Sequence, residues 1–295
     1  MWFLKISSRV SWVAAILICA ASSVAAQIPR ERANPGGPVD EVFWAPNIIT
    51  MGSVANLPKG NVNLTIMHVF GIATDGIKDL FGLDDLANIR IGLDYGLSDR
   101  VSIGFARSRF DKLFDFRFKG NFLRQTKDGR VPLELAIKGD MGIRTDENGF
   151  DLQDRPNYLG AVLLARKFSD TVSLQLTPMF SHFNTVFIES VGSSEIIEEE
   201  NDHFALGIGG RVVMGTRVAI LFEYISVIGS RSDGTRDEMG VALNVETGGH
   251  VFQLFLKTSQ WLTEQHAIAR NRDQFLKGDF RFGFNVNRVF SLVSN

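Results

Sequence analysis

Charged side chains recur at every second position in many segments of the chain, and apolar residues fill the positions between them. Because successive side chains of a strand point to opposite faces, each such segment would have one apolar and one charged face. A passage selective for anions would be lined mainly with Arg and Lys, whereas the signs here are nearly balanced. This mixture predicts either a weakly selective polar interior or paired charges that fill a narrow one. The residues that we expect to line the interior are Arg90, Asp94, Arg117, Lys119, Glu134, Lys138, Asp140, Arg211, Glu223, Glu246, Lys257 and Arg281.

Residue types that usually carry catalysis or bind metals are sparse. Cys19 is the only cysteine, and it lies in a segment that we expect to be removed. Ser181 and His182 are adjacent, but neighbours on a strand point to opposite faces and cannot act together as nucleophile and base. The acidic loop 189–202 could hold a hard cation such as Ca²⁺, although a solvated loop is the simpler interpretation. We therefore predict no enzyme activity, no catalytic residues, no cofactor and no metal site.

The alternation of apolar and polar residues begins at Asn61 and continues to the end of the chain in about twelve segments. Tight turns, as at 98–100 and 127–129, alternate with longer polar connections, as at 72–87 and 185–202. This order is typical of an all-β, up-and-down antiparallel transmembrane β-barrel, with short turns on one side of the membrane and longer loops on the other. Both ends of the barrel would then lie on the periplasmic side.

The apolar faces favour contact with lipid over contact with a packed core. They are uniformly Phe, Leu, Ile and Val, as in stretch 278–286, where Phe280, Phe282 and Phe284 share a face. Hydrocarbon requires only apolarity, whereas a core requires side chains of complementary size. In lipid every backbone polar group needs a partner within the protein, so the strands must close into a barrel. Segment 157–168 is apolar on both faces, and its phase stays open.

The chain that precedes the alternating region divides into two parts. Residues 1–26 combine basic residues, an apolar stretch and a small-residue end, which predicts a cleaved secretory signal peptide. Residues 27–60 form a periplasmic leader that could include an inner or extra strand, and the position of 42–60 stays open. The barrel would occupy 61–290. Trp44 and Trp261 flank it, and we expect interfacial anchoring, with loop packing as the alternative.

Three stretches of the chain resemble a family of Bacteroidetes-type outer-membrane β-barrels, a domain of unknown function. They span 42–71, 81–108 and 118–125, and the most specific part is NIRIGLDYGLSDRVSIG at 88–104. The resemblance implies a barrel in the outer membrane and brings no activity, substrate or site residues. Barrels of this class commonly end on an aromatic residue that the assembly machinery reads, whereas here five residues follow Phe290.

The bulk properties bound the function. The net charge of −2 provides no basic footprint for nucleic acid. With about twelve strands, the interior would be wider than a filled eight-stranded barrel and narrower than a porin. The sequence therefore predicts a narrow passive channel for small polar solutes in the outer membrane of a Gram-negative bacterium. The alternative is a closed structural or partner-binding barrel without transport activity. Expected partners are outer-membrane lipid and the barrel-assembly machinery, and a soluble partner stays unknown.

Overall fold

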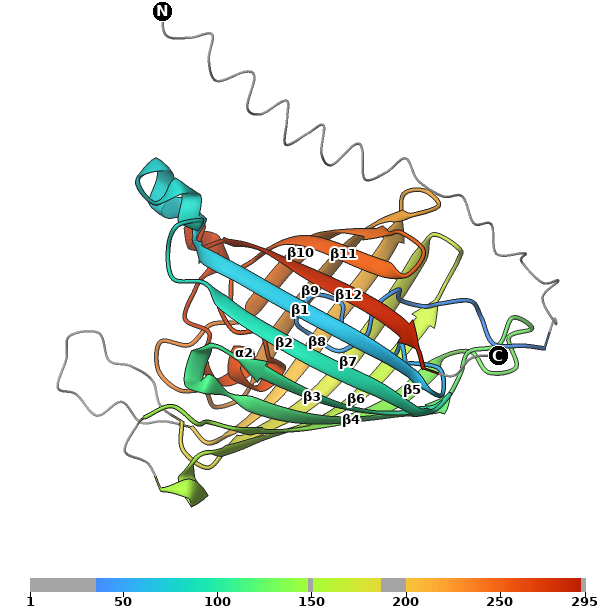
Figure 1. Cartoon of the computed structure of the whole chain (residues 1–295), viewed down its shortest axis with the longest axis horizontal. Helices are drawn as coiled ribbons and strands as arrows, with labels where there is room; N and C mark the ends of the chain where they lie inside the picture. The colour runs from blue at the N-terminus through green and yellow to red at the C-terminus, as the bar shows by residue number, and fades with distance from the viewer. Residues whose placement is uncertain (1–35, 148–150, 187–199, 293–295) are drawn as a thin grey trace, which may run out of the picture. The chain divides into compact units, whose positions relative to one another are not determined.

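The computed structural model describes residues 36–147, 151–186 and 200–292. The described residues form twelve strands that close into an antiparallel up-and-down barrel, which confirms the predicted fold class (Figure 1). Each strand pairs with its neighbours in the chain, and β1 pairs with β12 to close the sheet. The strands are β1 (Asn61–Ile72), β2 (Asn88–Ser98), β3 (Val101–Ser108), β4 (Phe114–Leu123), β5 (Glu134–Ile143), β6 (Pro156–Lys167), β7 (Val172–Phe183), β8 (Asp202–Val213), β9 (Val218–Ile228), β10 (Glu238–Glu246), β11 (His250–Lys257) and β12 (Arg281–Ser291).

The strands carry their apolar side chains on the outside of the barrel. In β2, Ile91 and Leu93 are each 52% exposed, whereas Arg90 is 4% exposed. In β12, Phe282 is exposed and Arg281 is buried. A protein that folded in water would bury these apolar faces, so the inverted arrangement requires an apolar solvent around the barrel.

The two rims of the barrel differ in the length of the connections that they carry. The short turns 99–100, 168–171, 214–217 and 247–249 lie at the rim where β1 begins and β12 ends. The opposite rim carries the longer loops, with short helices η1 (Ala73–Gly82), η2 (Phe110–Lys112), η3 (Leu152–Asp154), α2 (Glu264–Arg270) and η4 (Phe275–Lys277). Within the described ranges, no helix is long and apolar enough to cross a membrane.

One connection at the short-turn rim differs from the expectation. The predicted turn at 127–129 is present, with the Gly129 amide donating to the Thr126 carbonyl at 3.1 Å, but β5 begins only at Glu134 and the whole connection spans 124–133. The leader pairs with this connection: Pro38 bridges to Thr126, and the Val39 amide donates to the Gln125 carbonyl at 2.8 Å. The longer turn therefore provides backbone groups that hold the leader at the rim.

The structure of β6 explains why the sequence of 157–168 does not reveal which residues face inward. Its inner face is apolar, with Leu159, Ala161 and Leu163 buried, and its outer face exposes Tyr158 and Val162. The inner residues belong to a hydrophobic cluster that also contains residues from the segment before β1. Both faces are apolar because lipid would contact one of them and the chain itself packs against the other.

Candidate functional site

The interior of the barrel is occupied by residues 42–57, which we name the plug. Val42, Ile48, Ile49 and Met51 are each 3% exposed or less, and they share a hydrophobic cluster with inward residues of the wall. The plug is not an extra strand of the sheet, because β1 and β12 close the barrel without it. Residues 42–57, whose position the sequence left open, therefore lie in the lumen.

A tight fold at the centre of the plug aims several amides at one point. The Ile48 amide donates to the Met51 carbonyl at 2.7 Å, and the Ser53 amide donates to the Pro46 carbonyl at 2.8 Å. Successive amides that converge in such a turn form a concave site for an anion.

The carboxylate of Glu223 on β9 fills this concave site. It accepts the amides of Ile49 at 2.9 Å, Thr50 at 2.8 Å and Met51 at 3.1 Å, and it is buried. Carboxylates that accept backbone amides form charge-assisted bonds, which are stronger than neutral ones. Glu223 is therefore the principal polar contact between the wall and the plug.

Polar side chains of the wall also bond the remaining backbone groups of the plug. Gln175 uses both ends of its amide: it accepts the Val54 amide at 3.0 Å and donates to the Gly52 carbonyl at 2.7 Å. A peptide backbone in a buried site needs such partners, because an unpaired buried polar group is costly. The other wall donors are Lys119 to the carbonyls of Ser53 (3.1 Å) and Ala55, Asn121 to Val54 (2.8 Å), Gln253 to Ile48 (2.8 Å) and Asn285 to Ile49 (3.0 Å).

A second segment, the β11–β12 loop, folds back against the inner wall. Its helix α2 contacts β6, β7, β8 and β9 and is almost entirely buried. Glu264 of α2 accepts the Gly52 amide at 2.7 Å and forms an ion pair with Lys138, which also pairs with Asp140 at 2.8 Å. The loop and the plug therefore contact each other inside the barrel.

A network of charges and rings holds this loop to the long-loop rim. Asp111 of η2 forms an ion pair with Arg270 and lies 3.5 Å from His266 Nε2. Burial opposes ionisation of Asp111, but the His266 contact and the charges of Arg270 and Arg144 outweigh it and hold the Asp111 pKa well below its usual range. Burial lowers the pKa of His266, so the imidazole is neutral near pH 7.

Trp44 and Trp261 both lie inside this assembly. Trp261 stacks on His266 with ring centroids 5.1 Å apart and receives the Arg270 guanidinium at 4.2 Å. Trp44 lies beneath the guanidinium of inward-facing Arg211 at 5.0 Å. The expectation of interfacial anchoring is therefore wrong, because the segments that carry the tryptophans turn inward and not toward lipid.

The twelve charged residues that we expected to line the interior fall into three groups. Those that contact the plug, the leader or the β11–β12 loop are Lys119, Lys138, Arg211, Glu223 and Lys257, with Asp140 attached through Lys138. Those that pair along the wall are Arg90 with Asp115, and Arg117 with both Asp94 and Asp115. Those that lie apart from both segments are Glu134 beside Arg124 and Glu246 at a rim turn, whereas Arg281 joins the first group through Asp273 of the β11–β12 loop.

The sequence expectations did not include several residues that hold the plug. Glu238, which is fully buried, pairs with Lys257 at 2.8 Å and accepts the Thr50 hydroxyl at 3.0 Å. The wall amides Gln175, Gln253 and Asn285 were also absent from them. A side-chain amide carries both a donor and an acceptor, so it can pair with a peptide backbone. The inward-facing Asn and Gln residues in the sequence could therefore have identified the plug contacts.

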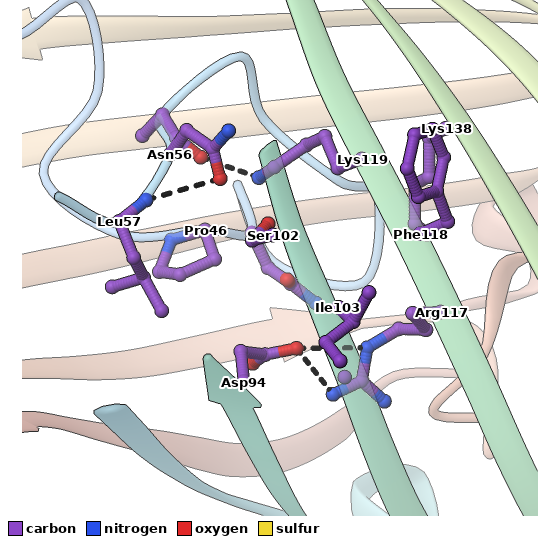
Figure 2. Close-up of a pocket in the computed structure, with 13 residues that line it drawn as sticks. Pro46, Asn56, Leu57, Asp94, Ser102, Ile103, Arg117, Phe118, Lys119 and Lys138 are labelled. Carbon is purple, nitrogen blue, oxygen red and sulfur yellow. Dashed lines mark hydrogen bonds and ion pairs between the residues drawn. The ribbon is translucent and has the colours of Figure 1, made fainter. Parts of the chain in front are cut away.

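A small cavity of about 30 Å³ remains between the plug and strands β2 to β5. Figure 2 shows Lys119 beside the plug, where it donates to the Ala55 carbonyl, with the Asp94–Arg117 pair on the wall below it. The volume of the cavity suffices for one or two water molecules. The charged residues around this cavity, which the sequence assigned to a solute path, bond to the plug or form ion pairs with one another.

The other candidate sites of the sequence lie outside this assembly. Ser181 and His182 lie on opposite faces of β7: Ser181 is buried, and His182 bonds Asp202 at 2.7 Å on the outer side. The acidic loop 189–202 falls mostly outside the described residues. Among the residues that the structure describes, no cluster of three or more His, Cys, Asp or Glu side chains could hold a metal ion. The absence of enzyme activity stays a prediction.

A comparison with protein families adds the identity of the domain. The family model described as "Membrane bound beta barrel domain (DUF5777)" matches residues 43–290. The chain belongs to this family. The resemblance to a membrane barrel of unknown function is thereby confirmed, whereas an origin in the Bacteroidetes stays a prediction. Because the match begins at Phe43, the family domain includes the plug as well as the barrel.

Solved structures similar to this member of the family are barrels with very different sequences. They include a KdgM porin, with a TM-score of 0.44 and 8% identity over 79% of this chain and 99% of that chain. OmpF of Salmonella typhi gives a TM-score of 0.36 and 8% identity over 78% and 97%, and LpxR from Salmonella typhimurium gives 0.35 and 12% over 78% and 99%. At these scores the likeness carries no argument about activity. No curated protein matches the chain.

Proposed function

We propose that the protein is an outer-membrane barrel whose plug closes the lumen at rest. In this proposal it acts as a structural or partner-binding barrel, and it does not leak solutes. The observation that carries the proposal is the Glu223 carboxylate, which accepts three consecutive amides of the plug. The signal peptide at 1–26 would direct the chain across the inner membrane of a Gram-negative cell.

The polar lining of the lumen fits a permanently bound plug better than it fits solutes that pass through. Glu223, Lys257 and Gln253 are each 1% exposed or less, and each bonds a plug atom. Without the plug, these groups would need water in its place, and the apolar residues Ile48, Ile49 and Met51 would lose their burial. Closure is therefore the state in which these three wall groups are bonded and these three plug residues are buried.

Conductance in planar bilayers tests the proposal. The complete mature chain should give no steady current, and a chain that lacks 42–57 should conduct. Glu223→Ala, which keeps the whole chain and removes only the carboxylate, should give intermittent current, and this second variant decides the matter if the deletion does not fold. A steady current through the wild-type chain equal to that of the deletion would overturn the closed state.

A gated passage for small polar solutes is the second candidate, and one feature favours it. The plug is held by wall side chains and by apolar packing, and it contributes no strand to the barrel sheet. It can therefore leave without breaking the pairing of any two strands. Liposomes that contain the Glu223→Ala chain should then swell in small sugars or amino acids faster than liposomes with the wild-type chain. Equal swelling rates would exclude this candidate.

A further inference from the structure

The long-loop rim carries an exposed apolar patch beyond the ends of β1 and β12. Ile77 of η1 is 78% exposed and Leu276 of η4 is 85% exposed. The two loops are joined where the Ala73 amide donates to the Phe280 carbonyl at 2.6 Å. We name this surface the loop patch, and its members are Ile77, Leu80, Phe81, Leu83, Leu86 and Leu276, each more than half exposed. Figure 1 shows η1 projecting from the rim, clear of the lumen.

The backbone of η1 presents part of this patch in an unusual conformation. Leu80 and Phe81 have φ values of 46° and 58°, in the left-handed region that residues with side chains rarely adopt. Such strain persists only where the surroundings compensate for it. A hydrogen bond from the Leu83 amide to the Leu80 carbonyl closes this turn, and the turn leaves both side chains more than half exposed.

The loop patch continues an apolar column on the outside of the barrel. On β1 and β12, His68, Phe70 and Phe284 form a cluster with ring centroids 4.3 to 6.4 Å apart. Phe70 lies only three residues before η1 begins at Ala73. The loop patch therefore follows directly on the lipid-facing aromatic cluster at the seam that closes the barrel, and η1 contacts both strands of that seam.

We propose that the loop patch contacts the outer leaflet of the membrane and anchors the β1–β12 seam there. Its composition favours lipid over a protein partner, because it consists of Ile, Leu and Phe without the Tyr, Trp and Arg that dominate protein interfaces. Lys78 and Asp79, which are also exposed, supply polar groups at the level of the headgroups. An apolar surface rimmed by charges is the form that an interfacial membrane contact takes.

Site-directed spin labelling tests this anchor on the complete chain in vesicles of phosphatidylcholine and phosphatidylglycerol. In a Cys19→Ala background, a nitroxide is attached at Ile77→Cys or at Leu276→Cys. A matched control label is placed at Asp128→Cys, in a turn of the opposite rim. Collision rates with oxygen, which partitions into lipid, and with a neutral nickel chelate, which stays in water, are then compared.

The two patch labels should show an oxygen-to-nickel ratio at least five-fold higher than the Asp128 label. A ratio equal to that of the control would overturn the proposal, because it would mean that the loop patch lies in water and does not contact lipid. If Ile77→Cys does not fold, the highly exposed Leu276 position gives the same decision.

Discussion

Replacement of Glu223 by Gln is expected to loosen the plug without altering the barrel. The carboxylate oxygen Oε2 accepts the amides of Ile49 and Met51, and Oε1 accepts the amide of Thr50. A glutamine keeps one acceptor oxygen, and its NH₂ group faces the remaining backbone donor. One bond is therefore lost, and the other two become neutral.

The magnitude follows from the strength of these bonds. A hydrogen bond to a charged group contributes about 1.5–3 kcal/mol, and a neutral one contributes about 1 kcal/mol. Loss of one charged bond and weakening of two others should reduce the free energy of plug docking by about 3 kcal/mol. Since 1.4 kcal/mol is a factor of ten, the undocked fraction should rise by about 100-fold.

The assay follows a cysteine placed in the plug. Ala45 is 2% exposed, and its described hydrogen bond uses only its carbonyl, so Ala45→Cys reports undocking with little disturbance. Its reaction with a polar maleimide should be about 100-fold faster in the Glu223→Gln chain. Glu246→Gln is the matched control, because that inward carboxylate bonds the Gly248 amide in a rim turn. Equal labelling rates in the two variants would refute the role assigned to Glu223.

Four further predictions concern other parts of the chain. Below about pH 6.5, hydrogen exchange in 258–271 should rise, because the folded state lowers the His266 pKa and binds fewer protons than the unfolded state; His266→Gln should remove this dependence. In a Trp44→Phe chain, brominated lipid should not quench Trp261, which is buried beside His266. Gly209→Val should accelerate Ala45→Cys labelling, whereas Gly160→Ala, which meets open space, should not. The intact mass of the purified protein should correspond to a chain that begins at Gln27.

The barrel could be predicted from the sequence because its determinants are local. In β2, the alternation of Ile91 and Leu93 with Arg90 and Asp94 defines two faces within five residues. Turn residues such as Asp99 then fix where one strand ends and the next begins. A membrane barrel repeats these two local rules around its circumference, so its strand order follows from the chain order.

The plug could not be predicted in the same way, because its contacts are not local. Ile49 meets Glu223 across 174 residues of sequence, and residues 42–57 show no period that predicts a regular element. The predicted location of Trp261 was wrong for a related reason. Proximity to a strand end does not reveal whether a loop turns toward lipid or toward the lumen. Besides the wall amides, a clue was available in 157–168, where two apolar faces require two apolar neighbours.

The wall of β8 is shaped for the residues that fill the lumen. The stretch GIGGRVVMG at 207–215 superficially resembles a dinucleotide motif, but Gly207 and Gly209 lie on the inner face of a strand. A Cβ atom at Gly207 would overlap the Met51 sulfur, and a Cβ atom at Gly209 would overlap the Ile48 side chain. Glycine weakens a strand interior and is tolerated where another part of the chain approaches closely. A lumen that held only water would gain nothing from these glycines, so their presence opposite Ile48 and Met51 indicates that the sequence of the barrel is adapted to the plug.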